Sequence, residues 1–213
     1  MNSTIRRIRP VRVALAATAA LLLAGCGGSG DSEGQQASGA TSASSSASPS
    51  GSDGASAGAH NAQDVSFAQG MIPHHRQAVE MAALAADRAS SPQVKALATR
   101  IKGAQDPEIR TMSGWLTAWG EDVPAEGGMD HSGHSGMAGM MSGADMTALE
   151  KASGAAFDTE FTRMMIEHHE GAVEMAGTEK AKGRYAPALT MADAIITAQK
   201  AEIAEMKGFL GKK

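Results

Sequence analysis

Between residues 60 and 213, apolar side chains recur at intervals of three and four residues in four segments. Segments 67–82 and 98–116 each place their apolar residues on one helical face, and so do segments 161–176 and 192–210. Ser, Pro and Gly residues interrupt the pattern between the two members of each pair, so each pair predicts a helical hairpin. In the second helices this face comprises Ala98, Ile101, Gln105, Ile109, Met112 and Leu116, and then Ala192, Ile195, Gln199, Ile203, Met206 and Leu210.

The two hairpins are copies of one another at an offset of 94 residues, which aligns residues 64–116 with residues 158–210. Each hairpin has one apolar face, and the two faces can be buried only against each other. The sequence therefore predicts an all-α domain over residues 60–213, a four-helix bundle built from two repeats. Pro107 predicts a kink, or a break at Asp106, in the second helix, where the second copy has Ala201.

The N-terminal residues have the features of an export signal rather than of a folded domain. Four arginines precede an apolar run over residues 13–24, which is too short to span a membrane comfortably, and Leu23-Ala24-Gly25-Cys26 resembles a bacterial lipobox. We expect residues 1–25 to be a lipoprotein signal peptide. We expect a lipid on Cys26 to anchor the protein to the outer face of the cell membrane. The alternative is plain secretion with an incidental cysteine.

Residues 26–59 are mostly Gly, Ser and Ala, which predicts a flexible, disordered tether. Amino-acid composition narrows the possible fold classes and partners. Aromatic residues make up 3% of the chain, which disfavours an all-β fold, and the net charge of −4 disfavours nucleic acid as a partner. A single cysteine excludes an intramolecular disulfide framework, whereas 14 methionines call for an explanation.

Methionine and histidine share one face of the first helix in both copies. Adjacent buried imidazoles are costly unless each finds a partner, and a metal ion is one such partner. The spacing is Met-x-x-His instead of the Glu-x-x-His of di-iron bundles, and thioethers favour copper(I). The alternative is a hydrogen-bonded polar core. The candidate metal ligands are Met71, His74, His75 and Met81, and Met165, His168, His169 and Met175.

Two further groups of residues accompany this face. Polar residues on the apolar faces of the second helices are expected to orient the histidines, with direct ligation as the weaker alternative: Gln105, Glu108, Gln199 and Glu202. The connection over residues 121–146 predicts an accessory, loosely organised metal site, with an inert linker as the alternative. Its candidate ligands are His131, His134, Met137, Met140 and Met141.

The duplicated Met-Ile-x-His-His and Ala-Val-Glu-Met-Ala stretches resemble the bacterial exported family known as domain of unknown function 305. The resemblance covers residues 60–212 and implies a ferritin-like fold in which the two histidine pairs are the hallmark residues. It also implies copper binding and copper tolerance in the cell envelope for some members. The first copy in this chain departs from the pattern at Gly70 and Pro73, where the second copy has Met164 and Glu167. The two sites are therefore expected to differ in affinity.

Together these features predict an extracytoplasmic lipoprotein that sequesters, buffers or delivers copper(I), with another copper protein of the envelope as a possible partner. One alternative is a ferritin-like metal-dependent oxidase, against which the missing Glu-x-x-His motif argues. Another is a structural or interaction bundle with a polar histidine core. The sequence shows no nucleophile elbow and no phosphate-binding glycine loop, so it does not itself indicate an enzyme.

Overall fold

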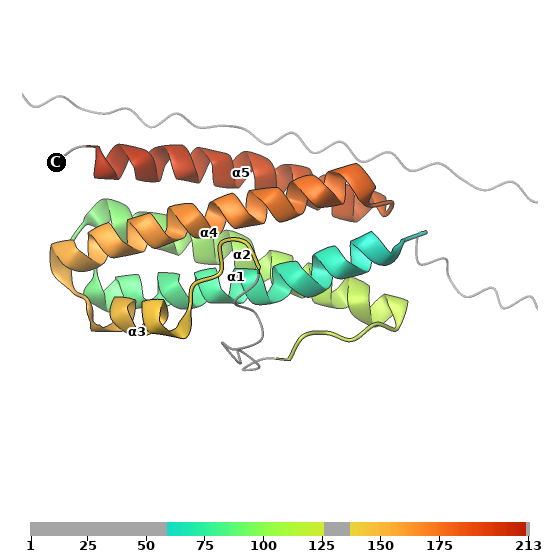
Figure 1. Ribbon diagram of the computed structural model, residues 1–213, viewed down its shortest axis with the longest axis horizontal. Coiled ribbons are helices and arrows are strands. Elements are labelled where there is room, and N and C mark those ends of the chain that lie inside the picture. The colour runs from blue at the N-terminus through green and yellow to red at the C-terminus, as the bar shows by residue number, and fades with distance from the viewer. Residues whose placement is uncertain (1–58, 126–136, 212–213) are drawn as a thin grey trace, which may run out of the picture. The chain divides into compact units, whose positions relative to one another are not determined.

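The computed structural model describes residues 59–125 and 137–211, and within them every named element is an α-helix (Figure 1). The predicted signal peptide, Cys26, nearly all of the tether, His131 and His134 lie outside these residues. None of the described helices combines the length and the apolar character needed to cross a membrane. The helices are α1 (Ala62–Arg88), α2 (Pro92–Trp119), α3 (Gly143–Lys151), α4 (Gly154–Lys182) and α5 (Ala186–Leu210).

The four long helices form the predicted bundle of two hairpins. α1 packs against α2, α4 packs against α5, and the hairpins meet mainly where α1 lies against α4 (Figure 1). The all-α fold class is thus confirmed. The hairpin loops fall at residues 89–91 and 183–185, where Ser, Pro and Gly interrupt the apolar pattern.

The break predicted at Asp106 was wrong, and one short helix was not predicted. α2 continues without a break through Pro107, because this residue lies on the exposed side of the helix, where water can hydrate the carbonyl group that a proline leaves without a donor. The connection between the hairpins also contains a short helix, α3, which begins at Gly143. Ser142 and Asp145 form a reciprocal capping box at its N-terminus, and this pair starts the helix.

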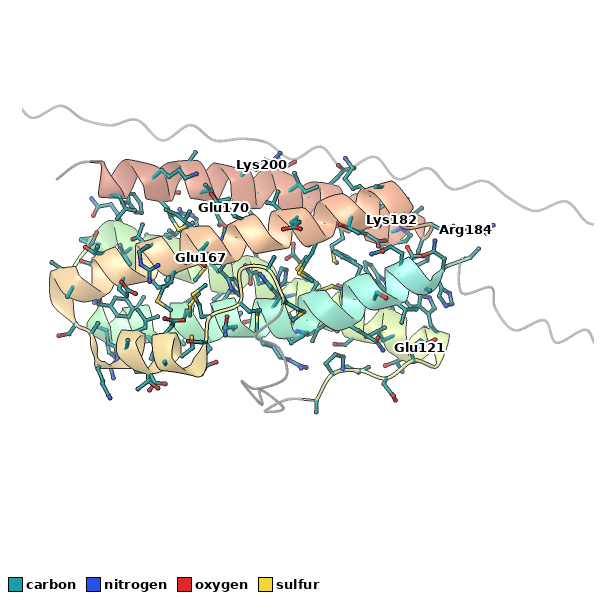
Figure 2. All side chains as sticks on the ribbon, viewed as in Figure 1. Glu121, Glu167, Glu170, Lys182, Arg184 and Lys200 are labelled. Atoms are coloured by element: carbon teal, nitrogen blue, oxygen red, sulfur yellow. The ribbon has the colours of Figure 1, made fainter. Side chains whose placement is uncertain are left out.

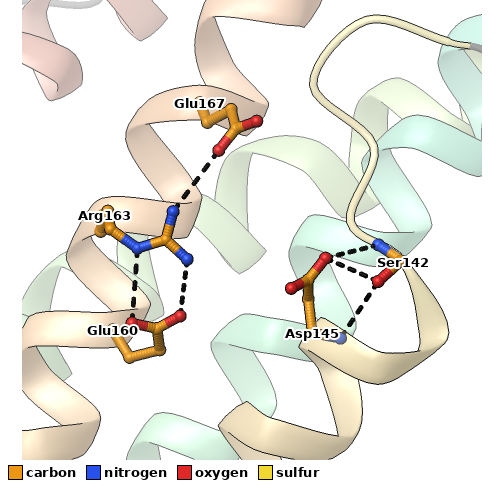
Figure 3. A network of polar contacts seen from close by, with 5 residues as sticks. All are labelled: Ser142, Asp145, Glu160, Arg163 and Glu167. Carbon is orange, nitrogen blue, oxygen red and sulfur yellow. Dashed lines mark hydrogen bonds and ion pairs between the residues drawn. The ribbon is translucent and has the colours of Figure 1, made fainter.

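Hydrogen bonds and a nearby positive charge stabilise the carboxylate that caps α3. Figure 3 shows the capping box of Ser142 and Asp145 beside Arg163, whose guanidinium contacts Glu160 at 2.7 Å and Glu167 at 3.7 Å. The Ser142 hydroxyl and amide hydrogen bonds, and then the charge of Arg163, lower the pKa of Asp145. The carboxylate therefore stays ionised and continues to cap the helix.

Two equivalent aspartates fasten each hairpin to the loop of the other. Asp64 on α1 accepts hydrogen bonds from the backbone amides of Arg184 and Tyr185, both at 2.9 Å. Its counterpart Asp158 on α4 accepts hydrogen bonds from Ser90 and Ser91 in the other loop. The repeated sequence thus produces a reciprocal clasp at the two ends of the bundle.

The interior consists of two apolar clusters with a polar layer between them. The first apolar cluster joins the C-terminal half of α1 to the N-terminal half of α4. The second apolar cluster joins the N-terminal half of α1 to the C-terminal half of α4. Methionine fills much of both clusters, whereas the labelled charged residues of Figure 2 lie on the surface of the bundle. Between the clusters lie the buried polar residues His74, His75, Gln77, Gln105, His168, His169 and Gln199.

Candidate metal centre

The four histidines of the repeat lie in this polar layer and are almost completely buried. His74 on α1 and His168 on α4 stack with their ring centroids 3.8 Å apart and their planes at 27°. These residues are 94 positions apart in the chain, so the equivalent histidines of the two copies meet at the junction of the hairpins.

The other histidine of each copy forms a hydrogen bond within its own hairpin. His75 Nε2 lies 2.8 Å from Glu108 Oε2, and His169 Nε2 lies 2.7 Å from Glu202 Oε2. A carboxylate can only accept, so the Nε2 atoms carry the protons and a neutral ring keeps its lone pair on Nδ1. Both Nδ1 atoms are buried without a hydrogen-bond partner among the described residues.

The stacked histidines differ from each other in their partners. His74 Nε2 lies 3.2 Å from the carbonyl oxygen of Ala138, which leaves its Nδ1 unpartnered. His168 has a carbonyl oxygen 2.9 Å from each ring nitrogen, that of Gly139 at Nδ1 and that of His74 at Nε2. A neutral imidazole can donate to only one of them. A metal ion could therefore reach His168 only if one of these contacts opened.

Burial keeps the stacked rings uncharged at neutral pH. Desolvation, followed by the charges of His168 and His75, holds the pKa of His74 well below its ordinary value. Desolvation, followed by the charge of His169, lowers the pKa of His168 to about 3, although two carbonyl contacts act in the opposite direction. Since a metal binds only the neutral imidazole, protons do not compete for the free nitrogen of His74 at pH 7.

A strap, residues 137–141 of the connection, lies directly on this layer. The buried amide of Gln77 forms two hydrogen bonds with the backbone of Met141, at 2.9 and 2.7 Å. Gly171 gives the strap room, because a Cβ atom there would lie 2.0 Å from the Ala138 oxygen. Gly139 adopts a positive φ of 78°. The last part of the connection is therefore docked against α1 and α4.

Sequence reasoning missed Gln77, Gly171 and the strap carbonyl groups. The available signal was that Gln77 and Gly171 occupy equivalent positions of the repeat, yet neither is an ordinary residue for a helix core. Of the candidate ligands in the connection, Met141 is buried in the first apolar cluster, whereas Met137 and Met140 are half-buried.

The methionines of the two helical faces are distributed between the clusters. Met81 and Met165 belong to one apolar cluster, Met71 belongs to the other, and Met175 is half-buried beside it. Gln105 and Gln199 are buried in the same polar layer as the histidines. Their Oε1 atoms have no hydrogen-bond partner in the described part of the chain. Glu108 and Glu202, by contrast, each form a hydrogen bond with a histidine.

The donor atoms fit a soft metal better than a hard one. Within residues 59–125 and 137–211, no three His, Cys, Asp or Glu side chains form a group that could hold a metal ion. Three imidazole nitrogens are nevertheless buried without a hydrogen-bond partner in this part of the chain, and the apolar clusters on both sides of the polar layer contain methionines. Nitrogen and thioether donors without free carboxylates suit copper(I), not calcium, magnesium or manganese.

Comparison with known proteins gives a family and several structural relatives. The family model described as domain of unknown function (DUF305) matches residues 64–210. A DUF305 protein from Streptomyces coelicolor, named as a predicted secreted protein, is 32% identical with a TM-score of 0.63, covering 70% of this chain and 93% of its own. No curated protein matches the chain.

Structures of the protein CopM also match. Its Cu(I)-bound form is 37% identical with a TM-score of 0.58, and its Cu(II)-bound form is 41% identical with a TM-score of 0.60. Each match covers 68% of this chain and 94% of CopM. CopM has also been solved with silver bound.

Proposed function

The chain belongs to the DUF305 family, and from this membership and the histidine layer we propose that it binds copper(I) as a cargo ion outside the cytoplasm. Binding there would sequester, buffer or deliver the metal. The observation that carries the proposal is the set of three buried Nδ1 atoms, of His74, His75 and His169, that have no hydrogen-bond partner among the described residues.

The two histidine–glutamate pairs support this proposal. A histidine that binds metal through one nitrogen usually donates from the other to a carboxylate or a backbone carbonyl. His75 and His169 have such a carboxylate, and His74 has such a carbonyl. In a purely structural polar core, the free nitrogens would instead be expected to have partners, because an unpaired buried polar atom costs about 1–3 kcal/mol.

The ligand set remains part of the proposal. The unpartnered Nδ1 atoms would act first, and His168 would join when a strap contact opens. Nearby thioethers, those of Met71 and Met165, would complete the coordination. Relatives support the choice of metal, since CopM at 37% and 41% identity has Cu(I)-bound and Cu(II)-bound forms.

A copper(I) titration of the purified protein against a chromophoric chelator tests this function, with zinc and iron(II) in parallel. We expect competition for copper(I) and little uptake of the other metals. Replacing His74, His75, His168 and His169 together by Ala should abolish most of the tight binding. His60→Ala is the control, because His60 stacks on Trp119 outside the polar layer. Unchanged copper binding in the fourfold variant would disprove the site.

Because four core substitutions can disturb folding, a gentler variant accompanies the fourfold one. Glu108→Gln combined with Glu202→Gln keeps the size of both side chains and removes only the charge that favours the donating Nε2–H. We expect it to retain the helical circular dichroism spectrum and to bind copper(I) more weakly. Full affinity in this variant would count against the proposed ligand nitrogens.

We also propose that the protein is attached to the outer face of the cell membrane through Cys26. The motif Leu23-Ala24-Gly25-Cys26 and the preceding basic and apolar segments support this anchor. Metabolic labelling with a palmitate analogue should modify the expressed full chain, and Cys26→Ala should lose both the label and the membrane fraction. Labelling that persists in Cys26→Ala would contradict the anchor.

A further inference from the structure

Gly70 marks the position where the two copies of the Met/His face differ most. The second copy has Met164 at this position, with a completely buried side chain. A Cβ atom on Gly70 would lie 3.0 Å from the Cε atom of Met175 and 3.8 Å from the Sδ atom of Met137. Two thioether side chains, from α4 and from the strap, therefore meet over the space that the missing side chain leaves.

The corresponding place in the other half of the bundle has a different character. The counterpart of Met175 is Met81, and both Met81 and Met164 are completely buried in the first apolar cluster. Met137 and Met175 are half-buried, so an ion in solution can approach them. The same duplicated motif thus yields a methionine pair enclosed in the core in one half and a methionine pair near the surface in the other.

A nitrogen donor lies within one helical turn of the second pair. His74 follows Gly70 by four residues and lies on the same face of α1. Its Nε2 faces the oxygen of Ala138, the residue next to Met137, and its Nδ1 is buried without a hydrogen-bond partner in the part of the chain that the structure describes. On α4, Gly171 contacts Ala138 and precedes Met175 by one turn. The strap, α1 and α4 thus each bring one donor to this region.

We propose that Met137, Met175 and His74 form a distinct soft-metal site between the strap and the two central helices. It takes one copper(I) or silver(I) ion through two thioethers and one imidazole. The inference rests on the proposed function and deepens it, because it makes the two halves of the protein unequal in metal binding. Neutral sulfur and nitrogen donors select a soft monovalent cation over zinc or magnesium. The enclosed pair Met81 and Met164 is packing only.

The test uses silver(I), which has no accessible redox chemistry here, and the purified full chain labelled with ¹³C in the methionine methyl groups. One equivalent of silver should shift the methyl signals of Met137 and Met175 before those of Met81 and Met164. Met137→Leu and Met175→Leu assign the two signals. Early shifts of the Met81 and Met164 signals instead would overturn the proposal.

Copper(I) competition measurements give the second readout. Losing even a residue that only orients a ligand lowers metal affinity about 10- to 100-fold, so Met137→Leu combined with Met175→Leu should weaken one site by at least about tenfold. Met81→Leu combined with Met164→Leu is the matched control and should leave that affinity unchanged. Gly70→Met, which copies the second repeat, should fill the space and abolish the same site.

These outcomes separate the two proposals. If the histidine variants lose copper and the Met137 and Met175 variants do not, the site over Gly70 is wrong and the proposed function stands. If the unaltered protein does not compete for copper(I) or silver(I) at all, both proposals fail.

Discussion

The two copies of the hairpin place matching residues at the centre of the bundle, but they surround them differently. His75 and His169 have the same partner at nearly the same distance, a glutamate at 2.8 and 2.7 Å. His74 and His168 stack on one another, but their partners differ. The strap supplies the carbonyl oxygen of Ala138 to His74 and that of Gly139 to His168. The histidine–glutamate contact within a hairpin recurs in both copies. Contacts with the connection do not recur, because the chain has a single connection for two copies.

The two ends of the bundle also share one contact and differ in another. Asp64 and Asp158 both clasp the loop of the opposite hairpin. Among the described residues, the Asp64 end alone contains a further buried carboxyl group, that of Glu179, whose counterpart in the first copy is Ala85. A duplicated sequence therefore builds a symmetric frame, and a few unmatched residues give its two halves different chemistry.

The largest expected effect compares the two clasps. Asp64→Ala should lower the free energy of unfolding by about 2–4 kcal/mol, because the completely buried Asp64 carboxylate is the acceptor for the part-buried backbone amides of Asn61, Arg184 and Tyr185. Asp158→Ala should cost about 1–2 kcal/mol, since Asp158 is only half-buried and water can reach the amide of Ser90. Urea denaturation measures both, and equal losses would show that the clasps are equivalent.

The docking of the strap is tested by two glycines of α4. Gly171→Ala should destabilise the protein by about 1–3 kcal/mol, because the new methyl group collides with the backbone of Ala138. Gly177→Ala should instead stabilise it by about 0.5–1 kcal/mol, since Gly177 is exposed with open space around it. Thermal denaturation of the two variants should move in opposite directions. A stable Gly171→Ala protein would mean that the strap is not held against α4.

The matching histidine–glutamate pairs should respond alike. Glu108→Gln and Glu202→Gln should each weaken copper(I) binding about 10- to 100-fold, the usual effect of removing a group that orients a ligand. Chelator competition with each single variant measures the losses. A loss confined to one of the two variants would show that only one half of the bundle binds the metal.

The smallest effect concerns the unmatched carboxyl group. Burial, and then the neighbouring Asp64, raises the pKa of Glu179 to about 8. The native state keeps a proton that the unfolded state releases above about pH 4.3, so stability should fall as the pH rises toward 8, by about 1–2 kcal/mol from pH 6 to pH 8. Glu179→Gln should remove this decline. Denaturation midpoints with the same pH dependence in both proteins would contradict it.

Much of the architecture could be predicted because it depends on local order and on repetition. The spacing of Ala98, Ile101 and Met112 identifies a buried helical face wherever it occurs, and its recurrence at Ala192, Ile195 and Met206 requires two hairpins that bury each other. The break predicted at Pro107 failed because a proline on an exposed helix face is tolerated within a helix that tertiary packing already holds.

The sequence by itself determined the four long helices, the repeat and the group of histidines with Glu108 and Glu202, since all of these follow from residue type and helical spacing. Only the tertiary structure decided which imidazole nitrogens are free. That depends on the carbonyl oxygens of Ala138 and Gly139, which carry no side-chain signal and reach His74 and His168 across 64 and 29 residues of chain. Backbone groups are chemically the same at every residue, so only folding can place them.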